Sequence, residues 1–154
     1  MDGLNEAHLS HIGRVRVSFY VSAPDLNPDE VTAAIGVEPD FKARRGDERR
    51  NYGGQVVSPH EKGVWMISTK GRVNSKDVNK HFFLLLRILL PHQEALARLV
   101  QQVNGETDFD VLWESSYLYA GTGPLLSRDA IKGASELEAA IGFDIYQIEG
   151  QEGP

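Results

Sequence analysis

The feature that most constrains the fold is a strand–turn–helix pattern that occurs twice in the sequence. Residues 15–24 alternate apolar and polar side chains and run into a helical pattern over 26–39, and residues 109–121 do the same before 125–146. Alternation with a period of two is typical of a strand with one buried face. Both units contain Ala-Ala-Ile-Gly, which predicts that each helix ends at its glycine. The chain is therefore predicted to combine strands and helices in one architecture.

The first unit carries clear signals for both of its elements. The predicted strand places Val15, Val17, Phe19 and Val21 on its apolar face. The following helix is predicted to begin with Asn27 as N-cap, followed by a proline at its first position, where the missing N–H costs nothing.

The middle of the chain gives weaker signals. Residues 41–45 are predicted to form a strand, followed by a mobile loop up to residue 62 and a strand over 63–69. A helix capped by Asn74 or Ser75 should follow, because apolar residues recur at helical spacing to Leu89, and Pro91 should kink it before residues 92–103. The apolar block 82–90 could instead be a buried strand, although its leucine content favours a helix.

The last unit completes the predicted order β-α-β-β-α-β-α-β. Ser127 is predicted to cap a helix that runs to Ala140, and residues 143–148 to form a closing strand. We therefore expect an α+β two-layer sandwich with a ferredoxin-like (split βαβ) core and an added C-terminal helix and strand. The expected single domain covers 13–149, with flexible tails at 1–12 and 150–154.

Composition excludes several classes of function. The 154 residues contain no cysteine, so thiolate metal sites and cysteine nucleophiles are excluded. The net charge of −6 is uneven, because residues 106–154 carry ten acidic residues against two basic ones. An acidic total argues against nucleic-acid binding. No segment resembles a signal peptide or a membrane span, so we expect a cytoplasmic protein that does not bind membranes.

Several short motifs occur in an order that resembles a known family. They are Phe19-Tyr-Val, Leu26-Asn-Pro-Asp-Glu-Val-Thr, Gly36-Val-Glu-Pro, Gly46-Asp, Gly63-Val-Trp, Gly121-Thr-Gly-Pro and Asp144-Ile-Tyr. Their joint order is similar to that of a bacterial family of unknown function, DUF4279, over roughly residues 14–148. The resemblance implies a bacterial, cytoplasmic α+β protein, and it supplies no catalytic residues.

The main candidate binding residues lie in two places. The segment 42–52 is rich in arginine and ends in a tyrosine, which suits an anionic group or a protein interface. A loop of the form Gly-Thr-Gly-Pro precedes the last helix, and its amides could hold a phosphate. The candidate residues are Arg44, Arg45, Arg49, Arg50, Tyr52, Tyr117, Tyr119, Gly121 and Gly123.

Other residues give little sign of chemistry. Asp108, Asp110 and Glu114 share one strand face, where the expected environment is solvent. The histidines lack the spacing of metal ligands, and no nucleophile motif is present, so we expect no metal, no cofactor and no catalytic residue.

These observations lead to three hypotheses. The first is a non-enzymatic protein-binding module of an immunity or regulatory type. The second is a domain or enzyme for a small anionic ligand that uses the Gly121 loop and the segment from Arg44 to Arg50. The third is self-association as a homodimer, through an exposed strand edge or through the apolar helix around Phe82 and Phe83.

Overall fold

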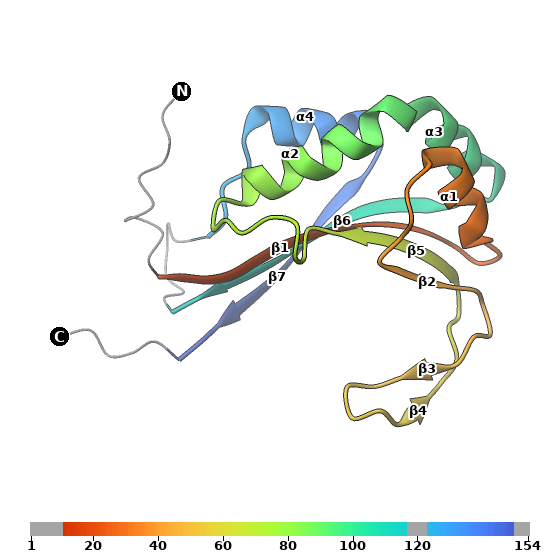
Figure 1. Cartoon of the computed structure of the whole chain (residues 1–154), viewed down its shortest axis with the longest axis horizontal. Helices are drawn as coiled ribbons and strands as arrows, with labels where there is room; N and C mark the ends of the chain where they lie inside the picture. Colours follow the sequence, from red (N-terminus) through yellow and green to blue (C-terminus); the bar gives the residue numbers. More distant parts are fainter. Residues whose placement is uncertain (1–10, 117–122, 150–154) are drawn as a thin grey trace.

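The computed structural model describes residues 11–116 and 123–149, and these form two layers. One layer is a five-stranded sheet in the order β2-β5-β1-β6-β7, and the other is a layer of helices on a single face of that sheet (Figure 1). The predicted mixed α+β class is therefore confirmed. In the described part of the chain, no helix is long and apolar enough to cross a membrane.

The central strand β1 (Ile12–Ala23) organises the sheet. It pairs antiparallel with β5 (Gly63–Ser68) on one side and with β6 (Glu106–Ser115) on the other. The short strand β2 (Phe41–Ala43) pairs antiparallel with β5, and β7 (Ala140–Gln147) runs parallel to β6 at the opposite edge.

The core lies between the sheet and the helices, as the alternation predicted. Val17, Phe19 and Val21 of β1 are fully buried, as are Phe109 and Val111 of β6. The ring of Phe109 lies 5.0 Å from that of Phe19 and 4.9 Å from that of Phe82 on the helix layer. Large aromatic side chains each bury about 150–250 Å². This contact therefore links the two layers strongly.

The first helix, α1 (Pro28–Ile35), confirms the predicted caps. The side chain of Asn27 accepts a hydrogen bond from the N–H of Asp29, and Gly36 ends the helix with a φ of 74°. A left-handed residue at this position favours glycine because a Cβ would be strained there.

The second helical segment is broken at the predicted proline. α2 (Val78–Leu89) is a helix, so the alternative of a buried strand over 82–90 is wrong. A 3-10 turn, η2 (Leu90–His92), contains Pro91 and leads into α3 (Gln93–Gln102). Asp77, rather than Asn74 or Ser75, is the N-cap of α2, and its carboxylate accepts from the N–H of Asn79 at 2.9 Å.

The last unit differs from its prediction. Ser127 caps α4 (Arg128–Glu136) as predicted, but the helix ends before Ala-Ala-Ile-Gly, and these residues enter β7. The hydroxyl of Thr107 donates to the carbonyl oxygens of Leu137 and Glu138, at 3.1 and 3.3 Å, and so holds the turn against β6. Pairing with β6 thus overrides the local helical pattern, and the same four residues have different structures in the two units.

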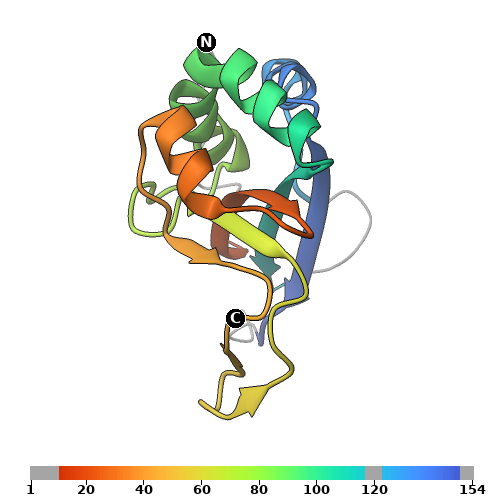
Figure 2. The same cartoon turned by 90° about the vertical axis from the view of Figure 1, so that its right-hand side faces the viewer.

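A small β-hairpin replaces the predicted mobile loop. β3 (Arg49–Arg50) pairs antiparallel with β4 (Val56–Val57), and we call residues 47–60 the arm. The arm projects from the sheet on the side away from the helices (Figures 1 and 2). At its base the N–H of Gly46 donates to the carbonyl of His60 at 2.8 Å. Two-residue strands are too short to produce an alternation signal, so the sequence pattern missed them.

Candidate functional site: the helix-free face of the sheet

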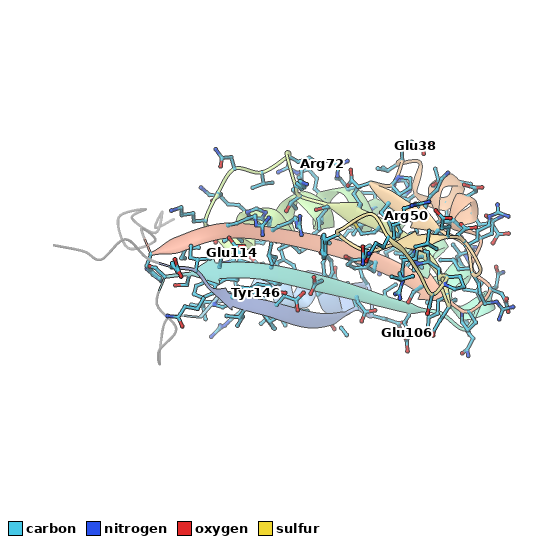
Figure 3. All side chains as sticks on the ribbon, turned by 90° about the horizontal axis from the view of Figure 1, so that it is seen from below. Glu38, Arg50, Arg72, Glu106, Glu114 and Tyr146 are labelled. Carbon is cyan, nitrogen blue, oxygen red and sulfur yellow. The ribbon has the colours of Figure 1, made fainter. Side chains whose placement is uncertain are left out.

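One face of the sheet is covered by none of the described helices, and its side chains lie in front of the strands when the molecule is viewed from below (Figure 3). The strand registers place five residues in one row across it. Phe41 pairs with Met66, Met66 with Tyr20, Tyr20 with Asp108, and Asp108 with Ala140. We call this surface the open face. The row begins apolar at β2 and becomes acidic at β6.

The apolar half of the open face lies over β2, β5 and β1. Phe41 is 41% exposed although it is a large apolar side chain, and its ring lies 5.7 Å from that of His60 at the base of the arm. Met66 and Tyr20 are partly buried beside it in the same row. Aromatic and methionine side chains are enriched where proteins bind one another. This half therefore has the composition of an interface.

The acidic half lies over β6 and β7. Asp108 and Asp110 point to the predicted side of β6 but are partly buried rather than fully solvated. Burial raises the pKa of the Asp110 carboxyl, and the nearby charge and hydrogen bond of Asp144 raise it further. Burial, and then the charge of Glu106, raise the pKa of Asp108. These carboxylates repel one another, and a positive group on this half would relieve that repulsion.

Two basic residues of β1 partly offset this charge. Arg14 forms an ion pair with Glu114 at 2.7 Å. The charge of Arg16 lowers the pKa of Asp110, although less than burial raises it. The hydroxyl of Tyr20 has a raised pKa, first because of burial and then because of Asp110. The neutral Tyr20 hydroxyl is thus retained next to the carboxylates.

The predicted arginine segment is largely neutralised within the molecule. Arg44 donates from Nη2 to Asp29 at 3.0 Å and to Asn27 at 2.9 Å, and Arg45 pairs with Asp25 at 2.6 Å. Lys42 also pairs with Asp29, and hydrogen bonds from Lys42 and Arg44 hold the pKa of that carboxyl below its usual value. These basic residues tie β2 to the start of α1.

Arg49, Arg50 and Tyr52 belong to the arm. Arg49 donates to the carbonyl of Ser58 at 3.1 Å, and Arg50 pairs with Glu48 at 2.6 Å and donates to the carbonyl of Gly54 at 2.9 Å. These contacts shape the hairpin. Tyr52, at its tip, is fully exposed.

The second group of candidate residues, in and before the Gly-Thr-Gly-Pro loop, lies mostly outside the described residues. Tyr117, Tyr119 and Gly121 lie outside the described residues, whereas Gly123 is described and exposed. The segment that follows Gly123 is bonded to Asn79 of α2, which accepts from the N–H of Ser127 at 2.7 Å and donates to the carbonyl of Leu125 at 3.0 Å. Among the described residues, no hydrogen bond or ion pair links it to the arginine segment.

The model of a family described as a domain of unknown function, DUF4279, matches residues 13–148. The chain belongs to the DUF4279 family. No curated protein and no solved structure matches it at the threshold applied.

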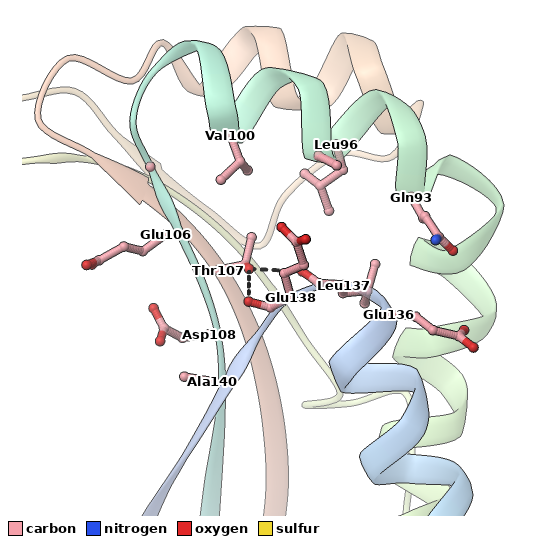
Figure 4. A pocket seen from close by; sticks show the side chains of 12 residues that line it. Gln93, Leu96, Val100, Glu106, Thr107, Asp108, Glu136, Leu137, Glu138 and Ala140 are labelled. Carbon is pink, nitrogen blue, oxygen red and sulfur yellow. Dashed lines mark hydrogen bonds between the residues drawn. The ribbon is translucent and has the colours of Figure 1, made fainter.

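A hollow of about 300 Å³ lies at one end of this DUF4279 sheet, between α3, the turn after α4 and the first residues of β6 (Figure 4). Leu96 and Val100 of α3 lie on one side of it, and Thr107 holds its floor through the two hydrogen bonds to the turn. Its acidic residues are Glu106, Asp108, Glu136 and Glu138. In the part of the chain that the structure describes, no three histidine or acidic side chains come together as metal ligands would.

Sequence reasoning missed the apolar row of the open face. Phe41, Met66 and Tyr20 lie on three strands that are distant in sequence, and only the registers bring them together. The available signal was that large apolar residues occupy the polar positions of their strands. This signal can be interpreted only once the pairing and register of the strands are known.

Proposed function

We propose that this DUF4279 protein is a non-enzymatic binding module that holds a segment of a partner protein on its open face. The observation that carries the proposal is the row from Phe41 to Asp108, which places the exposed Phe41 and the half-buried Met66 and Tyr20 beside partly buried carboxylates. None of the described helices covers this face (Figure 1). Isolated apolar residues on a surface are ordinary. A registered apolar row next to acids whose charge is only partly offset is better explained by a partner.

The chemistry of the open face defines the partner. An aromatic or aliphatic side chain would lie against Phe41 and Met66, and lysine or arginine side chains would lie against Asp108, Asp110 and Asp144. Five strands spaced about 4.8 Å apart make a face roughly 20 Å wide, which matches about six residues of extended chain. The expected occupant is thus a basic segment containing an apolar residue, rather than a nucleic acid.

The arm supports this assignment. It projects on the same side as the open face, and it carries Tyr52 and the exposed Val56 away from the core. Tyrosine is enriched at binding surfaces because it combines a large contact area with few rotatable bonds. We assign to the arm the role of a flank that contacts the partner beside the sheet.

We also propose a ferredoxin-like core, a bacterial cytoplasmic location and an immunity or regulatory role. The antiparallel order β2-β5-β1-β6 supports a ferredoxin-like core to which α4 and β7 are added. The absence of cysteine supports a reducing compartment, in keeping with a bacterial cytoplasmic protein. An immunity or regulatory role fits a small acidic module whose site offers binding rather than a reaction.

Affinity capture followed by titration tests the proposal. The wild-type protein and the double variant Asp108→Asn/Asp110→Asn would be used as baits, and each protein captured would be purified and titrated by calorimetry. We expect the partner to bind the double variant at least about tenfold more weakly, because close charge pairs at interfaces contribute more than about 1.4 kcal/mol. A second variant, Phe41→Ser, should weaken binding without changing its salt dependence.

The matched control removes two exposed acids from the helix layer, Glu94→Gln/Asp129→Asn. It changes the net charge by the same amount but leaves the open face intact. Equal weakening by the control would show a general charge effect. If both open-face variants bound the partner with full affinity, the open face would not be the binding site.

A further inference from the structure

We propose that a second site, a basic cavity between the start of β1 and the loop after β5, binds a small anion that carries a phosphate group. The cavity has a volume of about 250 Å³ and is lined by residues 13–16 of β1 and by residues of the segment 69–76. Its described lining residues include none of the arginine segment. The inference does not depend on the function proposed for the open face.

The cavity exists because β1 is longer than its neighbour. β5 ends at Ser68, opposite Ser18. The last backbone link between the two is at Thr69, whose N–H donates to the carbonyl of Val17 at 2.9 Å while its hydroxyl accepts from the Val17 N–H at 3.0 Å. From there the chain turns away to reach α2. Among the described residues, no strand therefore lies beside the first residues of β1 on this side, and the cavity forms there.

The lining of the cavity is strongly basic. Arg14, Arg16, Lys70 and Lys76 line it, and none of the described residues that line it is acidic. Arg14 already forms an ion pair with Glu114. Arg16, Lys70 and Lys76 form no ion pair within the described residues. Lys70 and Lys76 without an ion pair among the described residues, together with Arg16, whose charge is shared with nearby Asp110, point to an anionic ligand in a chain with a net charge of −6.

The loop that carries the two lysines is held in place. Arg72 bonds to both carboxylate oxygens of Asp40, and the carbonyl of Ser75 accepts from the imidazole of His81 at 2.7 Å. Gly71 adopts a φ of 74°, which allows the tight turn after Lys70. A preformed loop lowers the entropy cost of binding, because the lysine backbones are already positioned.

The size and charge of the cavity define the ligand class. Sites for drug-sized ligands usually span about 300–1,000 Å³, so a cavity of this size suits a phosphate with a small organic group. An arginine can form a bidentate pair of hydrogen bonds with two phosphate oxygens, and lysines add positive point charges. A doubly charged phosphate can pair with more of these cations than a singly charged carboxylate can.

Titration with inorganic phosphate tests this site. Binding would be followed through amide chemical shifts at constant ionic strength, with acetate as a parallel arm to separate phosphate from carboxylate. We expect saturable shifts in residues 13–16 and 69–76, with phosphate binding more tightly than acetate. The variant Lys70→Gln/Lys76→Gln should weaken phosphate binding about tenfold or more, because each charged hydrogen bond contributes appreciably. Arg16→Lys should also weaken it, since lysine cannot provide the guanidinium fork.

The matched control is Lys80→Gln/Arg98→Gln, which removes two exposed cations outside the cavity. Lys70 and Lys76 are exposed, so their removal should leave the urea midpoint unchanged, and the same samples would verify this. Shifts that do not saturate, equal weakening by the control, or tighter binding of acetate than of phosphate would each overturn the proposal.

Discussion

At the residue scale, His81 shows how a polar group is accommodated in the core. It is 1% exposed, and both ring nitrogens are bonded. A carbonyl can only accept, so Nε2 must donate to Ser75, and in the neutral imidazole Nδ1 then accepts from the hydroxyl of Thr69 at 2.6 Å. Thr69 in turn accepts from the Val17 N–H. This chain of bonds is complete only while the imidazole is neutral.

This arrangement makes stability depend on pH. Burial lowers the pKa of His81 below its ordinary value of 6.5, although the Ser75 carbonyl and the charge of Asp77 partly oppose this. The unfolded chain therefore binds the proton more readily. The contribution to stability is complete above about pH 6.5 and is lost as the pH falls toward the lower folded-state pKa.

Urea unfolding at about pH 7.5 and pH 5 should show a steeper loss of stability in the wild type than in His81→Gln, by at most about 1.4 kcal/mol per pH unit. The comparison uses only the pH dependence, so any overall destabilisation by the substitution cancels. The same pH dependence in both proteins would exclude His81 as its source.

Gly63 is a second position where a single added atom, a Cβ, would change the stability of the protein. A Cβ there would overlap the carbonyl oxygen of Leu26 and lie 2.8 Å from the Leu26 Cβ. Gly63→Ala should therefore destabilise the protein by about 1–3 kcal/mol, as other overpacking substitutions do. Gly142→Ala is the control, because its Cβ would meet no atom closer than 3.8 Å. Equal urea midpoints for the two variants would contradict this account of the contact.

At the element scale, the regular helices and long strands could be predicted from sequence. Asn27, Ser127 and Pro91 mark helix boundaries through local chemistry, and the structure confirms each of them. Ala-Ala-Ile-Gly before β7 could not be assigned in this way, since its conformation depends on pairing with β6, about 30 residues away in sequence. The arm and the open-face row likewise depend on cross-strand registers.

The arm should be separable from the rest of the fold. Its ends are joined by backbone hydrogen bonds from Gly46 to His60, and from His60 to Asp47 at 3.0 Å. Replacing residues 48–58 with a two-glycine link should change the free energy of unfolding by no more than about 1 kcal/mol, because few of the removed atoms are buried. Calorimetric or urea unfolding would check this. Loss of cooperative unfolding would show that the arm supports the core.

At the scale of the whole molecule, the two edges of the sheet differ. The edge strand β2 has three residues and carries Lys42, whereas β7 has eight and exposes Phe143, Ile145 and Tyr146 by 45%, 44% and 54%. Short, charged edges resist strand pairing, and long apolar edges favour it.

Of the two phenylalanines in the alternative contact through α2, Phe82 is fully buried and Phe83 is 40% exposed. Because only an edge strand offers unpaired backbone groups, we expect any homodimer to form through β7. Light scattering across a concentration series should show less self-association for Ile145→Lys than for the wild type. Lys42→Ser should behave as the wild type does. If Lys42→Ser changed self-association and Ile145→Lys did not, the contact would lie at β2 instead.

The central claim is that the open face binds the partner, and the absence of cysteine allows a direct footprint. Single cysteines would be introduced at Asp144 on the open face and at Lys132 on α4, and the rate of thiol alkylation would be measured with and without the captured partner. Asp144→Cys should react at least about tenfold more slowly in the complex, since a buried thiol is shielded from the reagent, while Lys132→Cys should react at an unchanged rate. Protection of Lys132→Cys alone would place the partner on the helices and contradict the account.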